Sequence, residues 1–66
     1  MEPKYPDITV ELVGHNGNAF SVIGRVSQAL RRSKVSAAEI KQYQTESMSG
    51  DYDNVLQTAM KWVTVE

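Results

Sequence analysis

The chain has 66 residues, no cysteine and one histidine, and its formal net charge is −1 at pH 7. This length suits one small domain, and the lack of cysteine excludes disulfides and thiolate metal sites. The charge balance argues against non-specific nucleic-acid binding, and no apolar run reaches the ~18 residues that a membrane span needs.

The first seven residues contain both prolines, Pro3 and Pro6, which favour extended backbone. We expect a frayed end over residues 1–6, from which Tyr5 can fold back onto the core. The segment lacks the apolar stretch of a signal peptide, so we expect a cytoplasmic protein.

A strand is predicted over residues 8–13, where apolar residues alternate with Thr9 and Glu11. A turn follows over residues 14–18, Gly-His-Asn-Gly-Asn, in which the glycines accept positive φ at no steric cost. Either asparagine of the turn is the expected N-cap of the next helix.

An amphipathic helix is predicted over residues 19–33, and Arg31 and Arg32 near its end suit the negative end of the helix dipole. Gly24 lies inside this helix, where glycine costs about 1 kcal/mol relative to alanine. We expect it to pack closely against another element, and the alternative is a helix crossing at a subunit interface. The apolar stripe consists of Ala19, Val22, Ile23, Val26, Ala29 and Leu30.

A second helix is predicted from Ser36 to about Ser47. Ser36 and Glu39 form a Ser-x-x-Glu capping box, and Val35 and Ile40 form the hydrophobic staple around it. Most of the remaining surface of this helix is polar, so we expect it at the surface. Its expected apolar anchors are Ala37, Ile40 and Tyr43.

A third helix is predicted to start after Ser49-Gly50-Asp51, with Gly50 as the C′ residue of the preceding helix and Asp51 or Ser49 as the new N-cap. The tail from Trp62 to Val65 is rich in strand formers, so we predict a short strand beside the first. The alternative is that the third helix continues to the end. The expected core stripe is Tyr52, Val55, Leu56, Ala59, Met60 and Val63.

These elements predict an α+β fold, one domain over residues 1–66, in which a short two-stranded sheet packs on three helices in the order β-α-α-α-β. So small a domain buries only about 60% of the surface of its unfolded chain. With neither a disulfide nor an expected metal, oligomerisation is the remaining common means of stabilising a small scaffold. We therefore expect a homodimer or a higher homo-oligomer.

The charges are unevenly placed along the chain. Residues 25–41 carry five basic residues and one acidic residue, whereas the rest carries two basic and seven acidic residues. This layout suits a self-complementary assembly or an anionic ligand, and an ordinary mixed-charge surface is the alternative.

The glycine turn is the first candidate site, because a strand, a turn and a helix N-terminus present N–H groups to an anion. It lacks the P-loop ending and the three-glycine dinucleotide spacing, so a plain turn is the competing interpretation. Arg25 is about 10 Å along the helix and can reach the turn, whereas Arg31 and Arg32 are about 20 Å away and can join only from a second subunit. The candidate ligand-binding residues are Gly14, His15, Asn16, Gly17, Asn18, Arg25, Arg31 and Arg32.

No catalytic constellation is recognisable. His15 has no identifiable orienting partner, no Gly-x-Ser-x-Gly elbow is present, and Asp51 and Asp53 lack the rest of a calcium-loop pattern. The basic run around Arg31 and Arg32 is too short to indicate a nucleic-acid surface. We therefore expect no enzyme activity, cofactor, metal or nucleic-acid partner. An adaptable contact surface is an alternative to the core for Met48, Tyr52, Met60 and Trp62.

Five segments together span nearly the whole chain: Tyr5-Pro-Asp-Ile-Thr-Val10, Gly14-x-x-Gly17-Asn-Ala-Phe20, Ala29-Leu-Arg-Arg32, Ser49-Gly-Asp-Tyr-Asp53 and Trp62-Val63. These segments resemble a family of short uncharacterised proteins of bacteria and their phages. The resemblance implies a phage or mobile-element accessory role, for which capture of host signalling nucleotides and binding of host defence proteins are analogies. It carries over no functional residue.

Taken together, these patterns lead us to expect a small non-enzymatic binding protein that acts as a homo-oligomer through protein contacts. Its expected partners are a second copy of itself and a further protein, with no membrane partner. The alternative is a protein that sequesters an anion or nucleotide, using the turn at residues 14–18 and the arginines of the first helix.

Overall fold

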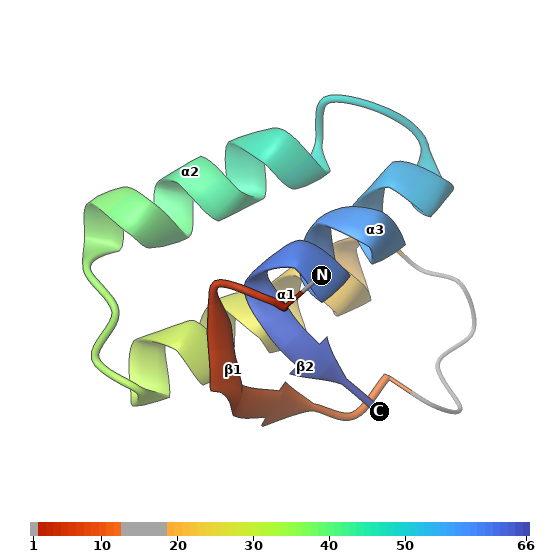
Figure 1. Cartoon of the computed structure of the whole chain (residues 1–66). Helices are drawn as coiled ribbons and strands as arrows, with labels where there is room; N and C mark the ends of the chain where they lie inside the picture. The colour runs from red at the N-terminus through yellow and green to blue at the C-terminus, as the bar shows by residue number, and fades with distance from the viewer. Residues whose placement is uncertain (1, 13–18) are drawn as a thin grey trace.

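The computed structural model describes residues 2–12 and 19–66, and it confirms the predicted α+β fold with the order β-α-α-α-β. Figure 1 shows α2 on one side of the molecule and the two strands on the other, with α3 between them and α1 passing behind the strands. None of the described helices combines the length and apolar character needed to cross a membrane. The elements are β1 (Tyr5–Val10), α1 (Ala19–Arg32), α2 (Ala37–Ser47), α3 (Tyr52–Trp62) and β2 (Val63–Val65).

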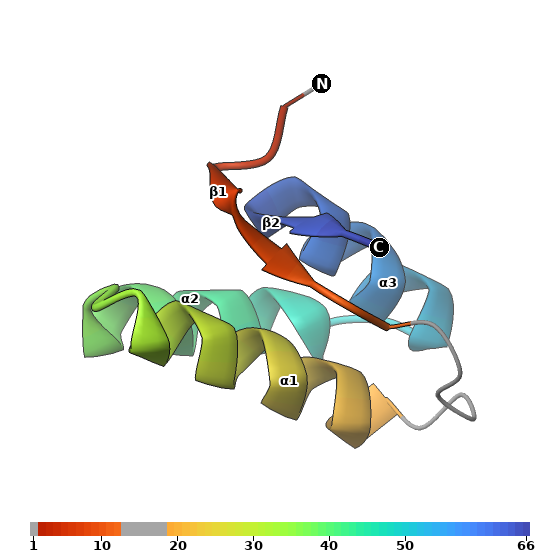
Figure 2. The ribbon, with the colours of Figure 1, turned by 90° about the horizontal axis from the view of Figure 1, so that it is seen from below.

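The two strands pair in parallel, on the same side of α1 and α2 (Figure 2). Tyr5 is opposite Val63 whereas Thr9 is opposite Thr64, so the register is irregular between them. Pro6 lies in this irregular stretch, which suits a residue that has no N–H to donate to a ladder. β1 starts earlier than predicted, so Tyr5 and Pro6, which we expected in a frayed end, belong to the strand.

The core is formed by one face of each helix together with the sheet. The predicted stripe of α1 is confirmed, but the stripe of α3 is rotated from the predicted one, since Met60 is 53% exposed and Trp62 only 4%. An indole ring buries more apolar surface than a methionine side chain, so the rotation favours the larger group. The buried apolar residues are Val10, Val22, Ile23, Val26, Leu30, Ile40, Tyr43, Val55, Ala59, Trp62 and Val63.

The predicted N-caps of α2 and α3 are confirmed. The Ser36 hydroxyl accepts from the Glu39 N–H at 3.3 Å, and the Asp51 carboxylate accepts from the Asn54 N–H at 3.0 Å. Two details of the prediction are wrong: Ala37 is exposed rather than an anchor, and the C-cap of α2 is Met48, which places Gly50 beyond the C′ position.

The end of α1 is a Schellman motif. The Lys34 N–H donates to the Arg31 carbonyl and the Val35 N–H donates to the Leu30 carbonyl, both at 3.0 Å. Lys34 is the C′ residue and has φ of 65°, in the left-handed region that favours glycine because a Cβ is crowded there. The helix therefore ends in a conformation that its own residue disfavours.

Replacing Lys34 by glycine should raise the free energy of unfolding by about 1 kcal/mol, because the left-handed backbone no longer carries a Cβ. Urea denaturation monitored by Trp62 fluorescence measures this. The matched control is Lys41→Gly, inside α2, which should lower the same quantity by about 1 kcal/mol. Equal destabilisation by both substitutions would contradict the argument.

Within residues 2–12 and 19–66, two buried hydroxyl groups on the same face of α2 have no hydrogen-bond partner, those of Tyr43 and Ser47. Burial raises the pKa of the Tyr43 phenol above its ordinary value. A buried hydroxyl without a partner loses the hydrogen bonds it makes to water in the unfolded chain. The Ser47 side chain thus fills space in the core, but its hydroxyl adds no hydrogen bond that would stabilise the fold.

The substitution Ser47→Ala should therefore raise the free energy of unfolding by about 1 kcal/mol, because it removes an unsatisfied hydroxyl and adds a better helix former. Thermal unfolding followed by circular dichroism measures the change. Ser49→Ala is the contrasting variant, because its hydroxyl donates to the Glu46 carbonyl at 2.7 Å and its loss should be slightly destabilising. A marked destabilisation by Ser47→Ala would refute the interpretation.

Candidate functional site

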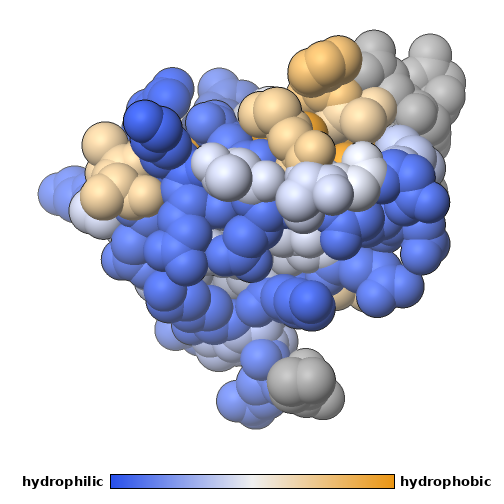
Figure 3. Space-filling model, turned by 90° about the horizontal axis from the view of Figure 1, so that it is seen from above, coloured by the Kyte–Doolittle hydropathy of each residue, from blue (hydrophilic) through white to orange (hydrophobic). Residues whose placement is uncertain are grey.

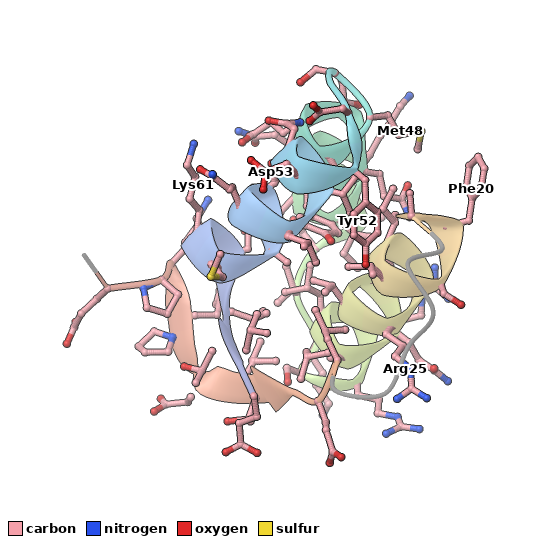
Figure 4. All side chains as sticks on the ribbon, turned by 90° about the vertical axis from the view of Figure 1, so that its right-hand side faces the viewer. Phe20, Arg25, Met48, Tyr52, Asp53 and Lys61 are labelled. Atoms are coloured by element: carbon pink, nitrogen blue, oxygen red, sulfur yellow. The ribbon has the colours of Figure 1, made fainter. Side chains whose placement is uncertain are left out.

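An apolar patch lies where the start of α1, the end of α2 and the start of α3 meet. Phe20 is 76% exposed and Met48 is 56% exposed, and Tyr52 beside them is half-buried. Figure 3 shows apolar side chains gathered at one corner of an otherwise largely hydrophilic face, and Figure 4 shows these three residues on the same side of the molecule. We call Phe20, Met48 and Tyr52 the apolar patch. They line a groove of about 280 Å³ together with Ala19, Ile23, Ser47, Gly50, Asp51 and Val55.

The position of Phe20 follows from helical geometry. Successive residues of a helix are about 100° apart, so a side chain one position after Ala19 and two before Val22 leaves the core stripe. The sequence patterns had singled out Met48 and Tyr52 as a possible contact surface but not Phe20. A large aromatic residue one position off the apolar stripe was the signal that could have found it.

Gly24 lies one helical turn after Phe20 and is exposed. Among the described residues, nothing lies within 4 Å of a Cβ built at this position. The prediction that Gly24 packs closely against another element is therefore wrong for the described part of the chain. Glycine destabilises the interior of a helix relative to alanine, and no contact within the described residues requires a glycine at this position.

The opposite flank of α1 forms a second hollow, of about 190 Å³, against β1. Arg25 and Arg32 both line it, whereas Arg31 is exposed elsewhere on the helix. The predicted site is thus divided, and the five turn residues Gly14 to Asn18 lie outside the described residues. The remaining lining residues are Thr9, Val10, Glu11, Gln28 and Ala29, of which the sequence patterns indicated none as ligand-binding.

A third polar cluster joins the N-terminal segment to α2. One carboxylate oxygen of Glu39 accepts from the Tyr5 hydroxyl at 2.6 Å and lies 2.7 Å from the Lys4 ammonium. These contacts explain why the capping box is only half formed, because the Glu39 side chain turns to β1 rather than to Ser36. The cluster lines a hollow of about 470 Å³ between β1 and the loop before α2.

The hydrogen bonds of this cluster shift the ionisation of all three groups. The Lys4 and Tyr5 donors hold the pKa of Glu39 below its ordinary value of 4.5. The same bonds raise the pKa of Lys4 and of Tyr5, because the Glu39 carboxylate accepts a hydrogen bond from the protonated form of each group and so stabilises that form. The ionised carboxylate is therefore the form that the folded chain prefers.

Stability should depend on pH through Glu39. A lowered pKa contributes stability at pH values above the ordinary 4.5, and this contribution is lost as pH falls through the folded-state value. The difference in unfolding free energy between the wild type and Glu39→Gln should therefore be larger at pH 7 than below pH 4. Chemical denaturation across this range measures it.

The variant Tyr5→Phe removes one of the two donors to Glu39 and should show a weaker dependence on pH than the wild type. A difference between the wild type and Glu39→Gln that stays constant from pH 7 to pH 3 would mean that the carboxylate contacts do not persist in solution.

The chain was compared with protein families, curated proteins and solved structures. No family model, curated protein or solved structure matches the chain. Within residues 2–12 and 19–66, no three acidic or histidine side chains come together as a metal site requires. Function is therefore argued from the exposure, charge and contacts of the described residues.

Proposed function

We propose that the protein is a non-enzymatic interaction module that self-associates through the apolar patch. The exposure of Phe20 carries this proposal, because a phenyl ring that is 76% exposed beside a 56% exposed methionine is costly in water and is typical of a contact surface. The flexible, polarisable side chain of Met48 suits a surface that adapts to its partner.

A second copy of the chain is the occupant that fits best. Phe20 projects from α1 and Gly24, one turn along the same flank, leaves a flat area. A two-fold axis between antiparallel α1 helices places Phe20 of each copy against Gly24 of the other. In such a dimer the exposed phenyl ring of each copy packs against the small glycine of the other, and the second copy supplies burial beyond what a 66-residue domain has alone.

The cellular setting that we propose rests on the resemblance of the sequence. The resemblance to short bacterial and phage proteins supports a phage or mobile-element accessory role, in which the assembled protein contacts a further protein in the cytoplasm. No catalytic role is part of the proposal, because no described constellation pairs a nucleophile or a base with an orienting group.

Sedimentation equilibrium over a wide range of protein concentration tests self-association. The wild type should form a dimer, and Phe20→Ser should weaken it at least about tenfold, as truncation of a central aromatic anchor does. The matched control is Met60→Ser, which changes a similarly exposed apolar residue on another surface and should leave the dimer unchanged. A wild type that stays monomeric at the highest concentrations would refute the proposal.

Gly24→Leu tests the helix crossing itself. Leucine is the better helix former, so the isolated domain should be at least as stable, whereas the larger side chain should block the approach of the second α1. A dimer that tolerates Gly24→Leu but not Phe20→Ser would keep the apolar patch as the interface and exclude the antiparallel crossing.

A further inference from the structure

The second hollow on α1 has the composition of an oxyanion site. Arg25 and Arg32 are two helical turns apart, about 10 Å between their Cα atoms, and Gln28 lies midway on the same flank. All three line the hollow, and Thr9 of β1 lines it from the other side. The residues that line this small space thus carry two guanidinium groups, an amide and a hydroxyl. In Figure 4, Arg25 lies well apart from Phe20 and Met48.

The two arginines of this hollow form no salt bridge within the described residues. The salt bridge within the described residues joins Lys4 to Glu39, and neither Arg25 nor Arg32 takes part in one there. The helix dipole explains a cation at Arg32, in the last turn of α1, but it does not explain Arg25 in the middle of the helix. An anion between them would relieve the repulsion of the two like charges.

Glu11 limits what the hollow can hold. This residue lines the same space, which leaves a formal charge of about +1 from the three charged lining residues. A volume of about 190 Å³ admits one or two phosphoryl groups rather than a long polyanion. Glu11 can also accept a hydrogen bond from a hydroxyl of the ligand, in the way that carboxylates bind hydroxyl groups elsewhere.

We propose that this hollow binds the phosphoryl or pyrophosphoryl group of a small phosphorylated molecule. Arg25 and Arg32 donate to the oxyanion from its two ends, as guanidinium forks do to phosphate oxygens. The Gln28 amide and the Thr9 hydroxyl donate between them. The site is complete within one chain, so it requires neither the second subunit expected from the sequence nor the apolar patch.

Titration of ¹⁵N-labelled protein with inorganic phosphate and with pyrophosphate tests this site, at an ionic strength held constant with chloride. The wild type should show saturable shifts at Gln28, Thr9 and the arginine side chains. Arg25→Gln and Arg32→Gln should each weaken binding at least about tenfold, the effect of losing a charge-assisted hydrogen bond.

The matched control is Arg31→Gln, which removes the same charge from the neighbouring position outside the hollow and should change the affinity less than twofold. Equal weakening by Arg31→Gln and Arg32→Gln would mean diffuse charge attraction and would overturn the site. Shifts that do not saturate would also overturn it, as would a single-stranded oligonucleotide that binds more tightly than pyrophosphate.

Two further variants separate this proposal from self-association. Glu11→Gln should strengthen phosphate binding, because it removes the one negative charge of the hollow. Phe20→Ser should leave phosphate binding unchanged while it weakens the dimer. Loss of phosphate binding in Phe20→Ser would overturn the single-chain site, whereas a monomeric wild type that still binds phosphate would overturn only the proposed function.

Discussion

The burial of Trp62 at the junction of α3 and β2 is the contact on which the arrangement of the other elements depends. The centroid of its ring lies 6.2 Å from that of Tyr5 on β1, with 28° between the two planes, and 5.8 Å from that of Tyr43 on α2, edge to face. The Lys4 ammonium sits 4.6 Å above the same ring and also pairs with Glu39. One side chain thereby joins both ends of the chain to α2, which lies far from them in sequence. Aromatic pairs of this kind contribute beyond the area they bury.

In this arrangement α1 has three flanks with different surroundings. One faces the core through Val26 and Leu30, the second carries Phe20 and Gly24, and the third presents Arg25 and Arg32 to β1. The period of 3.6 residues keeps these flanks apart on one short helix. A partner on the second flank would leave the third open, so the self-association and the anion binding that we propose are compatible within one assembly.

The elements and their caps were predictable because the signals for them are local. Ser36 and Asp51 each bond an N–H three residues later, and such short-range bonds follow from residue type and spacing alone. The predicted stripe of α1 holds for the same reason. The stripe of α3 was misplaced, because Met60 and Trp62 are both apolar and only the shape of the core decides which faces inward. The hollow between α1 and β1 was predicted in part, since Arg25 and Arg32 were named as candidate ligand-binding residues but Thr9 and Gln28 were not.

The sequence by itself determined the order of the elements, the starts of α2 and α3, and which residues are charged, because periodicity and capping act over a few neighbouring positions. Tertiary structure decided the rest. It paired the two strands in parallel, turned Glu39 from its own helix cap to Tyr5, and set Arg25 and Arg32 against β1. Each of these contacts joins segments that are distant along the chain, so it depends on how whole faces pack rather than on any local pattern.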